Sequence, residues 1–252
     1  MPSSSAVGEK VLDVLLLFDE SRPEMTAGEI TNLIGAPKST TYRYIRTLRD
    51  KELLQKTASG GFALGPRVLQ LARAVQKQRD IGQIALPIME ELGRQTRETI
   101  LLTRRFGRHS VCVERVEGPQ TVRISFERGQ VQPLHAGASS KLLLAYVDES
   151  EWDQLLTLPL EGFTENTTTQ PEMLKSQLHK IRSQGYCVSN GEVDIGARAV
   201  AVPINNHRGR FLAALTIVGP AFRMDDQVVS QHLALLKAAA ADIQNQLHHV
   251  DL

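Results

Sequence analysis

The chain opens with three stretches in which apolar residues recur at helical spacing. The first covers about Val7–Glu20. The second begins at Thr26–Glu29, which has the Ser/Thr-x-x-Glu form of a capping box, and ends at the turn Gly35–Pro37. The third covers about Lys38–Lys51. Each stretch predicts a short amphipathic helix. The predicted apolar faces are Val11, Leu12, Leu15, Leu16 and Phe18, then Ala27, Ile30, Leu33 and Ile34, and last Thr41, Tyr44, Ile45 and Leu48.

A hairpin and a further helix are predicted next. Leu54–Lys56 and Phe62–Leu64 flank Ala58–Gly61, whose composition is typical of a turn. Pro66 suits the first turn of a helix that extends to about Asp80. Its narrow apolar stripe consists of Val68, Leu69, Ala72 and Val75. Such a seam can pack on a symmetry mate or on the next domain.

Beyond Gly82 the pattern alternates between helical and extended segments. Helices are predicted around Ile84–Leu92, over Leu142–Val147 and Met173–Gln184, and from about Asp225 with the stripe Val229, Leu233, Leu236, Ile243 and Leu247. Strands are predicted over Thr99–Arg105, Ser110–Val116, Thr121–Phe126, Val200–Ile204 and Phe211–Val218. Strands joined by hairpins, with helices at both ends, favour an α+β domain in which helices cover an antiparallel sheet.

Composition places the chain among globular proteins. It has 252 residues, enough for two ordinary domains, of which 42% are hydrophobic and 23% charged. No apolar run approaches the roughly 18–20 residues of a membrane span, and Met1–Ala6 lacks the apolar stretch of a secretion signal. The two cysteines, Cys112 and Cys187, have no cysteine nearby, which is typical of a reducing compartment. We therefore expect a cytoplasmic protein.

The charge is unevenly distributed, although the whole chain carries a net charge of only +1. From Ala36 to Arg79 there are ten Lys and Arg against two acidic residues, whereas the segments on both sides are net acidic. A confined basic stretch attracts phosphate groups. A solvated basic surface has the same composition, so charge alone leaves both interpretations open.

The predicted third helix carries hydroxyls and cations opposite its apolar face. They follow a turn and lie on the N-terminal half of the helix: Lys38, Ser39, Thr40, Tyr42, Arg43 and Arg46. A recognition helix presents such groups to the major groove, where Arg reads guanine and Ser or Thr contacts bases or phosphates. The hairpin is then the wing, with Lys56 and its glycine tip against the DNA backbone or minor groove. An ordinary polar helix surface is the alternative.

Several segments in the same order resemble the IclR family of bacterial transcriptional regulators. They are PKSTTYRYIRTLRDKELL, GFALGPRVLQLA, GQVQPLHAGASSKLLLAY, GYCVSNGEVDIGARAVAVPI and ALTIVGPAFR, and they span nearly the whole chain. The resemblance implies a winged helix-turn-helix in residues 1–65, a linker helix in 66–81 and a GAF-like effector-binding domain in 82–252. It also implies a repressor without a cofactor, which binds an inverted-repeat operator in double-stranded DNA as a homodimer or a dimer of dimers.

The segment Pro133–Lys141 is the best candidate for ligand binding in the second half. Small residues lead there into a helix start, where free amide groups and the helix dipole favour a carboxylate. A loop capped by Ser139 or Ser140 has the same pattern. The resemblance favours ligand binding, and it implies that the amides of Ala138 and Ser139 receive the acid group of an effector.

Four further positions match the family's effector pocket. Ser189 and Thr216 align with its polar residues. Ala199 replaces a cysteine, and Val218 replaces a serine, of the pattern that binds glyoxylate or pyruvate. The pocket is therefore expected to be less polar, and the effector to be a small organic acid larger or more apolar than a two-carbon acid, such as an aromatic acid.

Two other functions compete with a ligand-responsive regulator. GAF-like domains include enzymes that act on sulfoxides through cysteines, and Cys112 and Cys187 are available, but no neighbouring pattern obviously lowers either pKa. His109 and Cys112 have the spacing of metal ligands but no second pair nearby. The other competitor is an architectural DNA-binding protein, whose pocket would be filled by side chains. We expect a regulator and no enzyme, because phosphate loops and nucleophile motifs are absent from the sequence.

Overall fold

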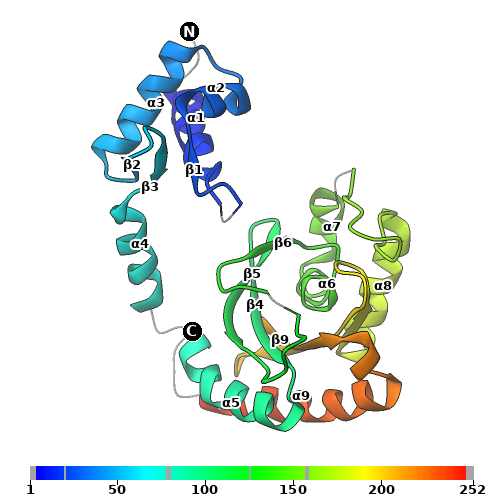
Figure 1. The fold of residues 1–252 in the computed structure, drawn as a ribbon. Helices are drawn as coiled ribbons and strands as arrows, with labels where there is room; N and C mark the ends of the chain where they lie inside the picture. The colour runs from blue at the N-terminus through cyan, green and yellow to red at the C-terminus, as the bar shows by residue number, and fades with distance from the viewer. Residues whose placement is uncertain (1–3, 20, 78–80, 125, 157–158, 248–252) are drawn as a thin grey trace. The chain divides into compact units, whose positions relative to one another are not determined.

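The computed structural model describes residues 4–19, 21–77, 81–124, 126–156 and 159–247. The backbone divides into two compact units, residues 1–79 and 80–252, which are described separately here (Figure 1). None of the helices described has the length and apolar character of a membrane span.

The N-terminal unit is a three-helix domain with a small antiparallel sheet, followed by a further helix. In chain order its elements are α1 (Ser4–Leu16), β1 (Glu24–Met25), α2 (Ala27–Ile34), α3 (Lys38–Asp50), β2 (Leu54–Lys56), β3 (Phe62–Leu64) and α4 (Pro66–Lys77). The strands lie in the order β1-β3-β2, and all pairs are antiparallel. The predicted winged helix-turn-helix architecture is confirmed.

Local sequence signals determine where α2 begins and ends. The Thr26 hydroxyl accepts a hydrogen bond from the Glu29 amide at 3.3 Å, and the Glu29 carboxylate accepts one from the Thr26 amide at 2.7 Å. Gly35 closes the helix in a left-handed conformation, with φ of 64°, which glycine adopts without steric cost. The capping box and the turn predicted from the sequence are therefore both formed.

The predicted apolar faces of the first two helices were partly wrong. Leu12 and Leu16 of α1 are 56% and 78% exposed, and Leu33 of α2 is also exposed. The core receives Val14, which was not predicted, and the predicted Phe18, which lies in the segment after α1. The reason is that α1 ends at Leu16, so Phe18 reaches the core from outside the helical repeat.

The helix α4 exposes most of the stripe predicted for it. Val68 is half-buried, whereas Leu69, Leu71 and Ala72 are exposed. The side chain of Val75 lies outside the described residues. Over the described part of α4, most of its apolar side chains are therefore exposed.

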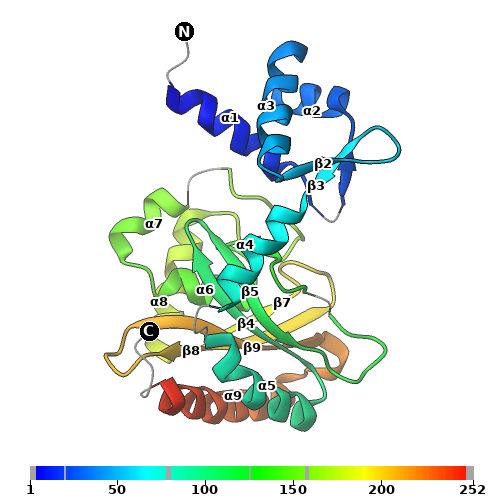
Figure 2. The same ribbon diagram turned by 90° about the vertical axis from the view of Figure 1, so that its left-hand side faces the viewer.

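The C-terminal unit is a six-stranded antiparallel sheet between two layers of helices, as Figure 1 and Figure 2 show from two sides. The strands lie in the order β6-β5-β4-β9-β8-β7. They are β4 (Thr99–Phe106), β5 (His109–Val116), β6 (Val131–Pro133), β7 (Cys187–Asn190), β8 (Ala197–Asn205) and β9 (Phe211–Pro220). The helices are α5 (Ile81–Thr96), α6 (Ala138–Ala145), α7 (Glu149–Leu155), α8 (Pro171–Gln184) and α9 (Asp226–Leu247), with a short 3-10 turn, η1, at Ala221–Arg223.

Each face of the sheet has its own core. On one face α5 and α9 pack against Ile100, Val200 and Ile217. On the other face α6, α7 and α8 pack against Leu101, Ala201 and other side chains that alternate with the first set. The predicted α+β class, with an antiparallel sheet covered by helices, is confirmed.

The strand predicted over Thr121–Phe126 was wrong, and β6 takes the edge of the sheet next to β5 instead. Val122, Ile124 and Phe126 were expected on one face of this strand. Ile124 and Phe126 do pack on the core, but Val122 is exposed. Side chains satisfy backbone carbonyls here: the Thr99 hydroxyl donates to Ile124 O at 3.2 Å, and Arg223 Nη2 donates to Val122 O at 2.9 Å. The sequence pattern also missed α7 and β7.

Candidate functional site

The helix α3 presents the side chains predicted for it on one exposed face. Thr41, Tyr44, Ile45 and Leu48 are buried and fix the helix against the domain core. Lys38, Ser39, Tyr42, Arg43 and Arg46 are exposed, and Thr40 is half-buried. The buried face predicted from the sequence is therefore confirmed.

An open groove of about 700 Å³ runs between the start of α2, α3 and the hairpin β2–β3. Among the predicted residues, Lys38, Tyr42, Arg46 and Lys56 line it, whereas Ser39, Thr40 and Arg43 lie outside it. The sequence reasoning missed Arg49, which adds a fourth cation. Arg46 lies 3.8 Å from Asp50, but both side chains are largely exposed, so this pair is weak.

A hydrogen-bonded anchor positions the hairpin beside α3. The Glu24 carboxylate of β1 accepts hydrogen bonds from the hydroxyls of Ser59 and Thr57, the latter at 2.7 Å. These bonds lower the pKa of Glu24, because they stabilise its charged form. The tip of the hairpin is thus tied to the sheet, and its cation Lys56 shares the groove with the cations of α3.

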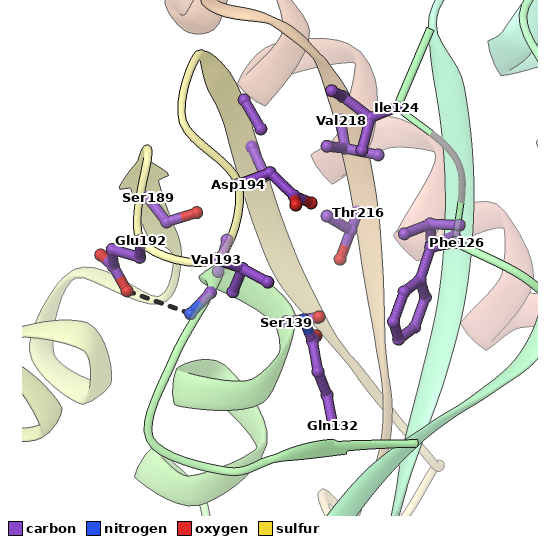
Figure 3. A pocket seen from close by; sticks show the side chains of 15 residues that line it. Ile124, Phe126, Gln132, Ser139, Ser189, Glu192, Val193, Asp194, Thr216 and Val218 are labelled. Carbon is purple, nitrogen blue, oxygen red and sulfur yellow. Dashed lines mark hydrogen bonds between the residues drawn. The ribbon is translucent and has the colours of Figure 1, made fainter. Parts of the chain in front are cut away.

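All six residues predicted for the effector pocket line one cavity of about 70 Å³ in the C-terminal unit (Figure 3). Ala138 and Ser139 come from the start of α6, Ser189 from β7, Ala199 from β8, and Thr216 and Val218 from β9. The register of the sheet explains why they meet: Ser189 pairs with Ala199, and Ala199 pairs with Val218 across three adjacent strands. The structure therefore brings together residues that are far apart in the sequence.

Two polar features of the cavity lack a partner of their own. The Thr216 hydroxyl is buried, with the residue only 2% exposed, and has no hydrogen-bond partner among the described residues. The helix α6 starts at Ala138 without a side-chain cap, and Gly137 precedes it with φ of 85°. A buried hydroxyl without a partner costs free energy, and uncapped amides at a helix start attract anions. Both features suit a ligand that carries an acid group.

An ion pair beneath the cavity ties its walls together. Lys141 Nζ of α6 contacts the Glu192 carboxylate, and their side chains are only 5% and 11% exposed. The other oxygen of Glu192 accepts a hydrogen bond from the Gly137 amide at 3.0 Å, drawn as the dashed line in Figure 3. Lys141 Nζ also donates to Gln177 Oε1 of α8 at 3.1 Å. The segment after β7 is therefore attached to α6, and Lys141 in turn joins α6 to α8.

Sequence reasoning missed Glu192, Val193 and Asp194, which lie between β7 and β8, and Ala197 at the start of β8. A signal for Glu192 was present in Lys141, a charged residue directly before the apolar run Leu142–Ala145. A buried cation needs an acidic partner, although the pattern alone does not say which one. The rest of the lining is largely apolar: Leu101, Ile124, Phe126, Ala199 and Val218.

The two cysteines are buried apart from this cavity. Cys112 and Cys187 are 1% and 2% exposed, and neither belongs to the lining residues. Burial raises the pKa of Cys112 and that of Cys187 to about 12, because it penalises the thiolate. The residues that the structure describes include no cluster of three His, Cys, Asp or Glu arranged to hold a metal ion.

Comparisons with known proteins match both units. Residues 9–58 match the IclR helix-turn-helix domain, and residues 73–245 match the bacterial transcriptional regulator IclR C-terminal domain. The transcriptional regulator XynR of Escherichia coli is 33% identical over 98% of this chain and 98% of its own length. The transcriptional repressor AllR of Salmonella typhi is 29% identical over 95% of this chain and 89% of its own. The crystal structure of an IclR homologue complexed with 4-hydroxybenzoate, from Microbacterium hydrocarbonoxydans, superposes with a TM-score of 0.81 at 28% identity, covering 96% of this chain and 99% of that one.

The cysteine environment leads to a prediction about thiol reactivity. At pH 8 a thiol with a pKa of about 12 is almost entirely protonated, and burial also blocks access. We expect neither thiol of the native protein to react with Ellman's reagent within minutes, and both to react at once in 6 M guanidinium chloride. Rapid reaction of one thiol in the native state would show that this thiol is neither buried nor raised in pKa.

The ion pair leads to a prediction about stability. Glu192→Gln leaves the Lys141 ammonium buried without a counter-charge and should lower the free energy of unfolding by about 3–5 kcal/mol. Adding Lys141→Met should recover much of that loss, because no buried charge then remains. Denaturation followed by the fluorescence of Trp152, the single tryptophan, measures both.

The matched control is Glu172→Gln, which removes one acid from the exposed pair with Lys175. We expect it to change the unfolding midpoint little, because exposed ion pairs are screened by water and salt. If Glu192→Gln and the double variant lose the same free energy of unfolding, the loss does not come from an unpaired charge on Lys141.

Proposed function

The chain belongs to the IclR family of bacterial transcriptional regulators, and we propose that it is a cytoplasmic repressor that releases its operator in response to a small organic acid. Its relatives are HTH-type transcriptional regulators, so the chain is a DNA-binding transcriptional regulator and not an enzyme. The proposal of repression is supported by the name of the AllR relative. A ligand changes the state of such a regulator only through its different affinities for the DNA-competent and DNA-incompetent forms.

The observation that supports residue-level DNA contacts is the exposed face of α3 beside the hairpin. We assign the N-terminal half of α3 to the major groove, where Arg43 and Arg46 are within the part that a recognition helix presents to base edges. Lys38, Ser39, Thr40 and Tyr42 then contact bases or phosphates. The hairpin residue Lys56, with Arg49, neutralises phosphates beside the groove.

A second copy of the chain is part of this proposal. One winged helix buries a limited surface on DNA, whereas a symmetric pair reads both halves of an inverted repeat. The exposed leucines of the N-terminal unit supply apolar surface for such pairing: Leu12 and Leu16 on α1, and Leu69 and Leu71 on α4. We infer a homodimer, or a dimer of dimers, with half-sites about one helical turn or its multiples apart.

The effector proposal rests on the unpartnered Thr216 hydroxyl next to the uncapped start of α6. We assign the effector's carboxylate to the amides of Ala138 and Ser139, with Thr216 and Ser189 as further hydrogen-bonding groups. The apolar residues Ala199 and Val218 favour an acid with an apolar body. The homologue that was crystallised with 4-hydroxybenzoate supports an aromatic acid.

The DNA proposal is tested with Arg43→Ala, because Arg43 is exposed on α3 and lies outside the domain core. If Arg43 makes a bidentate base contact, the variant should bind an operator selected from random duplexes about 1–3 kcal/mol more weakly, with little change on a scrambled duplex. Fluorescence-anisotropy titration measures both. Arg94→Ala, on exposed α5 surface of the other unit, is the control and should bind as the wild type does. An equal loss on both duplexes would reassign Arg43 to phosphate contact.

The effector proposal is tested with Ala138→Leu and Thr216→Val. The leucine fills the cavity and should abolish stabilisation by small carboxylic acids while leaving operator binding intact. The valine removes only the unpartnered hydroxyl, so it should leave stability unchanged or higher while weakening acid binding by about 0.5–1.5 kcal/mol. A thermal-shift screen followed by calorimetry measures these effects. If the same acid stabilises the wild type and Ala138→Leu equally, its site lies elsewhere.

A further inference from the structure

Two charged side chains line the cavity, and both are acidic: Glu192 and Asp194. Glu192 is neutralised, because it pairs with Lys141 and accepts a hydrogen bond from the Gly137 amide. The Asp194 carboxylate has no hydrogen-bond or ion-pair partner among the described residues; the bond formed by this residue runs from the Ala197 amide to its backbone carbonyl, at 3.1 Å. Asp194 is also exposed, so this unpaired negative charge borders both the cavity and the solvent.

Hydrogen bonds to its backbone hold the segment that carries Asp194. The segment Gly191–Gly196 begins and ends with glycines of positive φ, and the Gly191 amide donates to Ala197 O at 2.7 Å to close the turn. Thr167 Oγ1 donates to Glu192 O at 2.6 Å and fixes the segment from the side of α8. Figure 3 shows the Asp194 carboxylate pointing into the cavity beside Val218 and Thr216, whereas Ser139 lies farther away.

This geometry gives the cavity two chemically different ends. The end at α6 offers amide donors and the positive pole of a helix dipole, which bind an anion. The end at Asp194 offers a charged acceptor, which binds a hydrogen-bond donor and repels a second carboxylate. The rest of the wall is largely apolar, with Ile124, Phe126 and Val218 among its residues, and it also includes the polar side chains of Thr216 and Gln132.

We propose that Asp194 is a specificity-determining residue, and that the effector carries a hydrogen-bond donor at the end opposite its carboxylate. The effector class is then a hydroxy acid or an amino acid with a long or aromatic body, and dicarboxylic acids are rejected. This inference rests on the effector pocket proposed above. It adds the requirement for a donor, which neither Ala138 nor Thr216 imposes.

The test uses two matched series of acids that differ only at the far end. One series is phenylacetate, 4-hydroxyphenylacetate and 4-carboxyphenylacetate, and the other is hexanoate, 6-hydroxyhexanoate and adipate. Calorimetry on the full chain gives the affinity of each acid for the wild type and for Asp194→Asn, which keeps the shape of the side chain and removes its charge. Asp242→Asn, on an exposed position of α9 over the opposite face of the sheet, is the matched control.

We expect the hydroxy acid to bind the wild type about tenfold more tightly than the unsubstituted acid in at least one series, as a hydrogen bond to a charged group allows. The dicarboxylic acid should bind more weakly than both. In Asp194→Asn the preference for the hydroxy acid should fall to about threefold or less, and binding of the dicarboxylic acid should improve. The Asp242→Asn variant should retain the wild-type order.

Two other outcomes overturn the inference in distinguishable ways. If the acids bind the wild type without preference for the hydroxy group, or if Asp194→Asn keeps the wild-type order, Asp194 is only a surface carboxylate and the effector pocket stands. If no acid of either series binds the wild type at millimolar concentration, the carboxylate pocket itself fails, and the donor requirement fails with it.

Discussion

The ion pair between Lys141 and Glu192 holds together the elements that enclose the cavity. Without it the segment after β7 would keep only the Gly137 hydrogen bond to the start of α6, and Lys141 would be a buried cation inside a helix whose following residues are apolar. Desolvation makes that arrangement costly unless the pair is complete and further hydrogen bonded. Gln177 and the Gly137 amide supply those bonds, so the pair also fixes the distance between α6 and α8.

The acid proposed as effector would meet no free cation among the described lining residues of the cavity. Lys141 is already neutralised by Glu192, so it does not add a net charge to the cavity. What remains for an acid is the helix dipole, a few amides and the Thr216 hydroxyl, each of which contributes modestly. Modest binding suits a sensor, because a ligand that shifts an equilibrium must also leave when its concentration falls.

Sequence reasoning succeeded where neighbouring residues determine the structure, and it failed where a residue packs against residues far away in the sequence. The capping box at Thr26 and the buried face of α3 follow from residues within a few positions of one another. The exposure of Leu12 and Leu16 does not follow from nearby residues. The face of α1 that enters the core depends on where the helix ends and on Phe18 beyond it. The alternation at Thr121–Phe126 likewise predicted a strand, because a pattern cannot reveal that β6 occupies the neighbouring edge position.

The cavity residues were predicted from a family resemblance and not from periodicity, which explains what was missed. Ala138 and Thr216 match positions of the family's pocket. Glu192 and Asp194 also lie in a segment that resembles the family, but they match no pocket position, and no helical or strand repeat marks a direction in this irregular stretch. Only the fold shows that Glu192 meets the Gly137 amide, 55 positions away in the sequence. Long-range contacts of charged loop residues therefore had to come from the structure.

The surface proposed to bind DNA and the cavity proposed to bind an effector would attract negative charge by different means. The groove beside α3 gathers Lys38, Arg46, Arg49 and Lys56, whose attraction for phosphates is long-ranged and weakened by salt. The cavity has no basic side chain among its described lining residues, and offers short-range hydrogen bonds in an apolar wall. A small acid therefore gains little in the groove, where salt screens a single charge, and a DNA backbone cannot enter a cavity of about 70 Å³. Under the proposed function each anion has its own unit, so a change in acid concentration would act on DNA binding through the equilibrium between states and not through competition for the same cations.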